Sequence, residues 1–172
     1  MTAALATTER AIVHRTRGSG HGPITRLASP GDLGEFLKPF VFLDFFGFDV
    51  TGGHKGFGLH PHSGIATLTW PMEGDTQYED TTGEQGTLRG GGVEWMRAGN
   101  GVWHTGAPAP GVERVSGFQL WVALPPSEEN GPAQSMYLAP SQVPAQGPAR
   151  VLLGRYGAAQ SPIAAPSPMN YL

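Results

Sequence analysis

Residues 57–70 read FGLHPHSGIATLTW, where two histidines flank a proline and an apolar, β-branched run follows. The run at 65–70 is typical of a buried strand. Residues i and i+2 of a strand point to the same face, about 6.7 Å apart along the chain. Pro61 points the other way and has no backbone donor, which suits a strand edge or a bulge. The stretch therefore predicts that His60 and His62 lie side by side on one face.

Short apolar or alternating segments recur on both sides of this stretch, separated by glycine-rich turns. We expect strands near residues 40–46, 65–70, 76–81, 87–89, 93–97, 102–105 and 116–124. No window shows helical periodicity, and 26 Gly and 16 Pro with only 15% charged residues disfavour long helices. The sequence predicts an all-β fold in which two antiparallel sheets pack into a jelly-roll-like barrel.

The length of 172 residues suits one domain with tails. We assign residues 1–130 to the barrel, including an N-terminal arm. Residues 131–172 are rich in Pro and Ala, and we expect them to form an extended segment without a core of its own.

The composition excludes several classes of protein. The net charge is −3 and the pI is about 6.0, and because Lys and Arg form no run, direct nucleic-acid binding is not expected. There is no cysteine, so a metal would be held by His or carboxylate. We find neither a signal peptide nor the roughly 18 apolar residues of a membrane span, and expect a cytoplasmic protein.

A third histidine, His104, lies in an apolar strand that follows a Gly-Asn-Gly turn. A buried imidazole is costly without a partner, so metal ligation is one interpretation and a hydrogen bond to a backbone carbonyl is the other. Strands far apart in sequence face each other inside a barrel, which allows His104 to meet the His60–His62 pair. We place His54 at the rim of such a site.

Four segments together resemble the pirin family of the cupin superfamily. They are HPHSGIATLTW from 60, EDTTGEQGTL from 79, GGVEWMRAGNGVWHTGAP from 91 and GFQLWVALP from 117. The resemblance implies a cupin β-barrel with one metal ion, usually iron, held by three His and one Glu. Pirins are usually two-barrel proteins whose N-terminal barrel binds the metal, so this chain resembles a single barrel or a first half. In a first half, residues 131–172 would be the start of the second barrel.

The resemblance assigns metal ligation to His60, His62 and His104. The family's glutamate falls on Gly106, and a second acidic position falls on Ala66, so both carboxylates are missing. Glu94 and Glu113 are the acidic residues closest to His104 in sequence. Because Glu94 alternates with apolar neighbours, we expect it to face solvent. The expected cofactor is Fe(II) or another divalent ion, with Zn, Ni, Cu and Mn as alternatives.

Two functions stay open. Some bacterial pirins are quercetin 2,3-dioxygenases, which implies an oxygenase with a small aromatic substrate; candidate pocket residues are Phe57, Met96, Trp103 and Trp121. The animal pirin is an iron-dependent transcriptional co-regulator, which implies a non-enzymatic protein that binds a protein partner and uses the metal as a structural or redox switch.

Overall fold

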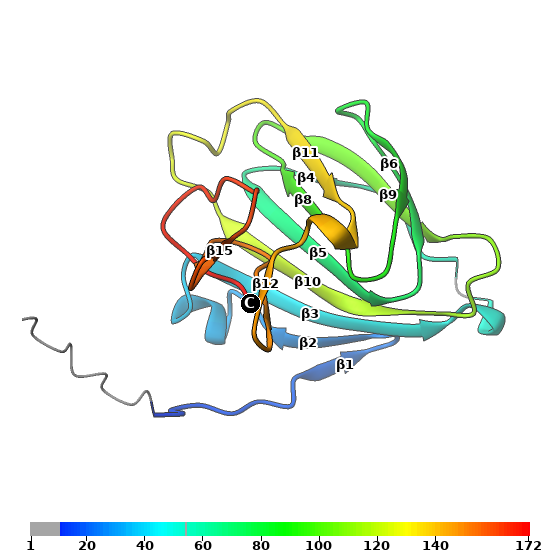
Figure 1. Ribbon diagram of the computed structural model, residues 1–172, viewed down its shortest axis with the longest axis horizontal. Helices are drawn as coiled ribbons and strands as arrows, with labels where there is room; N and C mark the ends of the chain where they lie inside the picture. The colour runs from blue at the N-terminus through cyan, green and yellow to red at the C-terminus, as the bar shows by residue number, and fades with distance from the viewer. Residues whose placement is uncertain (1–10, 54) are drawn as a thin grey trace, which may run out of the picture.

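The computed structural model describes residues 11–53 and 55–172, and two antiparallel sheets packed face to face make up most of it (Figure 1). The larger sheet has the order β1 (Ser19–His21), β2 (Ile24–Ala28), β3 (Phe40–Asp49), β10 (Arg114–Ala123), β5 (Ile65–Glu73), β8 (Val93–Arg97), β11 (Gln134–Leu138). The smaller sheet has the order β4 (Phe57–His62), β9 (Val102–Pro108), β6 (Thr76–Asp80), β7 (Gln85–Leu88).

Only short 3-10 helices accompany these sheets in the described part of the chain. They are η1 (Leu33–Glu35), η2 (Val50–Gly52) and η3 (Pro140–Gln142). None of the described helices is long and apolar enough to cross a bilayer.

The predicted all-β barrel is confirmed, and each of the seven expected strands is present. The hairpin of β1 and β2 was not predicted; it extends the larger sheet where an arm was expected. Its alternation is short and its residues are mostly exposed or half-buried, so the apolar pattern is weak there.

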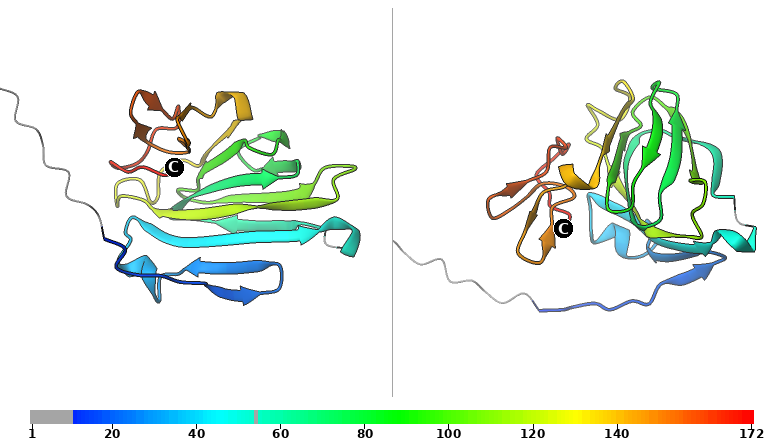
Figure 2. Two further views of the ribbon diagram at one scale, coloured as in Figure 1. Left: turned by 60° about the horizontal axis from the view of Figure 1, so that its bottom comes forward. Right: turned by 45° about the vertical axis from the view of Figure 1, so that its right-hand side comes forward.

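The segment after residue 130 covers the outer face of the larger sheet (Figure 2). It first supplies β11, which pairs with β8. It then forms two small hairpins, β12 (Ala145–Gln146) with β13 (Ala149–Arg150) and β14 (Arg155–Tyr156) with β15 (Ala159–Gln160). Apolar side chains from this segment complete the main core cluster: Leu138, Val143, Leu152, Leu153 and Ile163. That the segment begins a second barrel stays a prediction.

This cover decides which residues face the barrel interior. Leu120 and Val122 of β10 pack outward, beneath the C-terminal segment. The alternating residues Gln119 and Trp121 therefore point inward, where Trp121 lies 5.3 Å from the ring of His62. The more apolar face of the strand thus packs outside the barrel, and the interior receives the polar side chains.

Candidate metal centre and adjoining cavity

The three histidines predicted from the sequence meet inside the barrel. β4 and β9 pair antiparallel with His60 opposite His104, and His62 lies on the same face as His60. The Nε2 atom of His104 is 2.9 Å from Nε2 of His60 and 3.1 Å from Nε2 of His62. One ring nitrogen from each residue lies within 4.8 Å of the others.

The outer nitrogens of two of these rings fix their tautomers. Nδ1 of His60 donates to the carbonyl of Gly58 at 2.7 Å, and Nδ1 of His104 donates to Oε1 of Glu94 at 3.1 Å. A neutral imidazole with Nδ1–H has a bare lone pair on Nε2. These lone pairs therefore face one another across about 3 Å, an arrangement that a cation between them would satisfy. The donor set thus fits a metal ion.

Burial favours the neutral form of His62. His62 and His104 are buried, and His60 is half-buried. Burial chiefly, and then the positive charges that His104 and His60 would carry, lower the pKa of His62 to about 4. Neutral imidazole is the form that binds metal, so the site keeps His62 ready for ligation at neutral pH.

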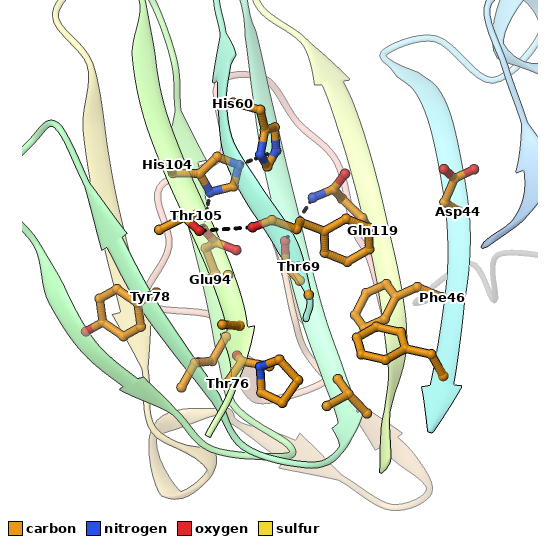
Figure 3. Close-up of a pocket in the computed structure, with 18 of the residues that line it drawn as sticks. Asp44, Phe46, His60, Thr69, Thr76, Tyr78, Glu94, His104, Thr105 and Gln119 are labelled. Carbon is orange, nitrogen blue, oxygen red and sulfur yellow. Dashed lines mark hydrogen bonds and ion pairs between the residues drawn. The ribbon is translucent and has the colours of Figure 1, made fainter. Parts of the chain in front are cut away.

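A cavity of about 100 Å³ opens beside His60 and His104 (Figure 3). Its far end is apolar and is lined by side chains that include Ile24, Phe46, Phe48, Phe57 and Val115. The hydroxyl of Thr105 donates to the carbonyl of Phe57 at 2.9 Å and fixes the strand that carries the histidine pair.

The wall of the cavity carries a row of polar side chains that crosses the inner face of the larger sheet. Successive strands place one residue each in register, and we call this set the polar row: Arg26, Asp44, Gln119, Thr69, Glu94 and Tyr137. Four of its members line the cavity: Asp44, Gln119, Thr69 and Glu94. The row gives an otherwise apolar interior several hydrogen-bonding groups beside the histidines.

The contacts within the polar row do not use all of its hydrogen-bond donors. Arg26 binds both oxygens of Asp44, at 3.2 and 3.3 Å. The amide oxygen of Gln119 accepts from Trp121, and its amide nitrogen lies 3.4 Å from the hydroxyl of Thr69. An amide carries two N–H donors and a hydroxyl one, so the row can donate to an oxygen atom in the cavity.

Glu94 is buried, and its predicted exposure to solvent is wrong. Its neighbours Val93 and Trp95 belong to the outer core beneath the C-terminal segment, so Glu94 points into the barrel. Both faces of β8 are covered, and the alternation of the strand gave no sign of which face is interior. Glu113, the other acidic residue considered, is exposed.

The two positions expected to lack a carboxylate lie in different places. Gly106 lines the cavity, and a Cβ atom built there meets no atom within 4 Å. Ala66, by contrast, is fully buried in the outer core cluster, on the face of β5 that turns away from the histidines. Of these two positions, therefore, only Gly106 lies beside the cavity and has room for a side chain.

Of the four candidate pocket residues, two lie close to the histidines or the cavity and two do not. Phe57 lines the cavity, and Trp121 contacts His62 and stacks on Phe42 at 4.3 Å. Met96 lies in a separate core cluster, and Trp103 is 48% exposed on the outer side of β9. His54 lies outside the described residues.

Comparison with known proteins agrees with this architecture. The chain is 33% identical over 160 residues to a Pseudomonas aeruginosa protein with the provisional name quercetin 2,3-dioxygenase, covering 86% of this chain and 56% of that one. A quercetin 2,3-dioxygenase structure from Acinetobacter baumannii superposes with a TM-score of 0.75 and 31% identity, covering 86% of this chain and 56% of that chain.

The bacterial pirin YhhW from Escherichia coli, solved with nickel(II), shares the fold at 21% identity with a TM-score of 0.56 over 69% of this chain and 52% of its own. The chain spans little more than half the length of these relatives. The Pirin family model matches residues 24–122, which is more than half of the chain. This chain therefore belongs to the pirin family.

Proposed function

We propose that the chain is a metal-dependent oxygenase of the quercetin 2,3-dioxygenase type, with a divalent ion held by His60, His62 and His104. The observation that carries the proposal is the convergence of three Nε2 atoms, two of them fixed as bare lone pairs by hydrogen bonds at Nδ1. The names of the relatives from Pseudomonas and Acinetobacter supply the reaction type.

The donor set favours a divalent transition metal. Imidazole nitrogen suits Fe, Ni, Cu and Zn, and three histidines supply it here. These ions are therefore the candidates. When bound, such an ion would supply open positions for O₂ and for an oxygen atom of the substrate.

The cavity defines what the substrate must look like. Phe46 and Phe57 offer faces and edges for a ring, and Thr69 and Gln119 offer donors to its oxygen substituents. At about 100 Å³ the cavity is smaller than the roughly 300–1,000 Å³ of sites that enclose drug-sized ligands. We therefore expect one oxygenated aromatic ring to enter, rather than a whole three-ring flavonol. Both atoms of O₂ would enter the ring-opened product, so no further reductant is needed.

The test is a metal and oxygen assay on the purified chain. We expect close to one divalent ion per chain after loading with Fe(II) or Ni(II), and oxygen consumption with quercetin or with single-ring catechols. His104→Ala should lose both. A loaded protein that consumes no oxygen with any of these compounds contradicts the oxygenase proposal, and a chain that binds no metal contradicts the site.

Two exposed apolar side chains favour a second candidate function, the binding of a protein partner. Leu59 is 64% exposed and Trp103 is 48% exposed, and both belong to the strands that carry the histidines. Such side chains suit contact with a protein partner. Full metal binding without oxygen consumption would favour this alternative, a metal-dependent binding protein.

A further inference from the structure

The buried carboxylate that contacts the histidine cluster comes from a strand of the opposite sheet. Glu94 lies on β8 of the larger sheet, and His104 lies on β9 of the smaller one. Their side chains are only 8% and 6% exposed, and Oε1 of Glu94 lies 3.1 Å from Nδ1 of His104 (Figure 3). The contact therefore spans the interior of the barrel and ends on the imidazole at the centre of the cluster.

We infer that Glu94 is a positioning residue that replaces, from behind His104, the carboxylate missing at position 106. It would hold Nδ1 as the donor, leave Nε2 bare, and offset part of the charge of a bound dication through the imidazole ring. The inference rests on the metal binding proposed above.

The surroundings of Glu94 give this carboxylate one strong partner. The hydroxyl of Tyr137 lies 3.5 Å from Oε1 of Glu94 but donates to Asp80 at 2.8 Å, and it has a single proton to give. Among the described residues, no Lys or Arg forms an ion pair with Glu94. A buried carboxylate is costly unless it is paired, so its charge is available to the cation that His104 would bind.

The charge of the proposed metal site indicates what the contact between Glu94 and His104 would do. Three neutral imidazoles leave a divalent ion uncompensated, and Gly106 adds no ligand atom. Carboxylates that accept the second N–H of a ligating histidine raise the basicity of that histidine, and their loss typically costs 10–100-fold in metal affinity. A carboxylate at position 106 would offset the charge of the metal ion by binding it directly, whereas Glu94 would offset that charge through the imidazole ring of His104.

Two substitutions of Glu94 distinguish the effect of its negative charge from the effect of its hydrogen bond to His104. Glu94→Gln keeps an oxygen that can accept from His104 but removes the charge, whereas Glu94→Leu removes both. Thr69→Val is the matched control, because Thr69 is the neighbour of Glu94 in the polar row and forms no hydrogen bond with a histidine. Affinities for Ni(II) and Mn(II) would be measured by calorimetry, with circular dichroism to check the fold.

We expect roughly 10–100-fold weaker binding for Glu94→Gln, still weaker binding for Glu94→Leu, and no more than a twofold change for Thr69→Val. Adding Gly106→Glu to Glu94→Gln should recover at least part of the loss, since position 106 has room for a side chain. Wild-type affinity in Glu94→Gln would overturn the inference and leave metal binding intact. Failure of the wild-type chain to bind either ion would instead overturn the proposed function.

A measurement on the metal-free wild-type protein needs no variant. Nitrogen NMR of the imidazoles at pH 8 should find His104 protonated on Nδ1 and bare on Nε2. The opposite tautomer would show that Glu94 does not hold the ring and would overturn the inference, even if every Glu94 variant failed to fold.

Discussion

Thr69 and Gln119 are the uncharged residues of the polar row that line the cavity. If they donate to a substrate oxygen, Thr69→Val should weaken substrate binding or raise KM by roughly 2–10-fold, because one hydrogen bond contributes about 0.5–1.5 kcal/mol. The metal content should not change. Thr76→Val is the control, since Thr76 lines the same cavity from β6 and lies outside the row. Equal effects of the two substitutions would argue against a specific role for the row.

Single residues also show where sequence reasoning worked. The two-residue period of a strand was enough to place His60 and His62 together. The meeting with His104 depended on barrel closure and on the family resemblance, because no local pattern links residues 42 or more apart. Glu94 was misplaced because alternation identifies two faces but not which one is interior. The apolar VLL run at 151–153 was the available signal, since Leu152 and Leu153 belong to the same outer core cluster as Val93 and Trp95.

At the scale of elements, Asp80 joins β6 of one sheet to β11 of the other through the hydroxyl of Tyr137. Burial alone would raise the pKa of Asp80, but hydrogen bonds from Thr82 and Tyr137 outweigh it and hold the pKa below its ordinary value. A carboxyl group whose pKa is depressed in the folded protein stabilises the fold at pH values above its pKa in the unfolded chain. This stabilisation is lost as the pH falls through its pKa in the folded protein. We therefore expect the urea concentration at the unfolding midpoint to decrease as the pH drops below about 4.

Asp80→Asn should lower the urea midpoint at neutral pH and flatten its dependence on pH below about 4. Asp49→Asn is a control, because the Asp49 side chain is 67% exposed and pairs with an arginine at the surface. An acid transition that keeps its full slope in Asp80→Asn would show that other carboxylates dominate it.

The C-terminal segment acts as a second layer on the larger sheet, and its contribution can be measured. Leu152 is 2% exposed and packs in the main core cluster. Leu152→Ala should lower the free energy of unfolding by about 2–5 kcal/mol, the usual cost of a buried Leu→Ala cavity. Leu172→Ala, at a residue that is 49% exposed, should change it little. A loss below about 0.5 kcal/mol for Leu152→Ala would mean that the segment unfolds separately from the barrel.

Elements with strong alternation were predictable, whereas their faces were not. The strand at 116–124 alternates cleanly, but its apolar face packs beneath the C-terminal segment and not toward the barrel interior. The Pro- and Gly-rich composition of that segment hid its role, because its apolar residues come in short runs without a period. A second layer depends on contacts far apart in sequence, which local patterns do not encode.

At the scale of the whole molecule, the proposed site joins the two sheets. The strands that carry the three histidines, β4 and β9, belong to the smaller sheet, and the Glu94 contact reaches the larger one. A ligand that binds only the folded state stabilises it by about 4 kcal/mol at a free concentration of roughly 1,000 times Kd. Saturating Ni(II) should therefore raise the unfolding midpoint of the wild-type chain, and a chelator should reverse the change.

Hydrogen exchange shows whether this stabilisation crosses the barrel. Protection should rise in β8 as well as in β4 and β9, since His104 transmits the constraint to Glu94. His104→Ala should abolish both effects, and Mg(II), which prefers oxygen ligands, should produce neither. Increased protection confined to β4 and β9 would mean that the metal stabilises one sheet alone, and that the contact between the sheets contributes little to holding them together.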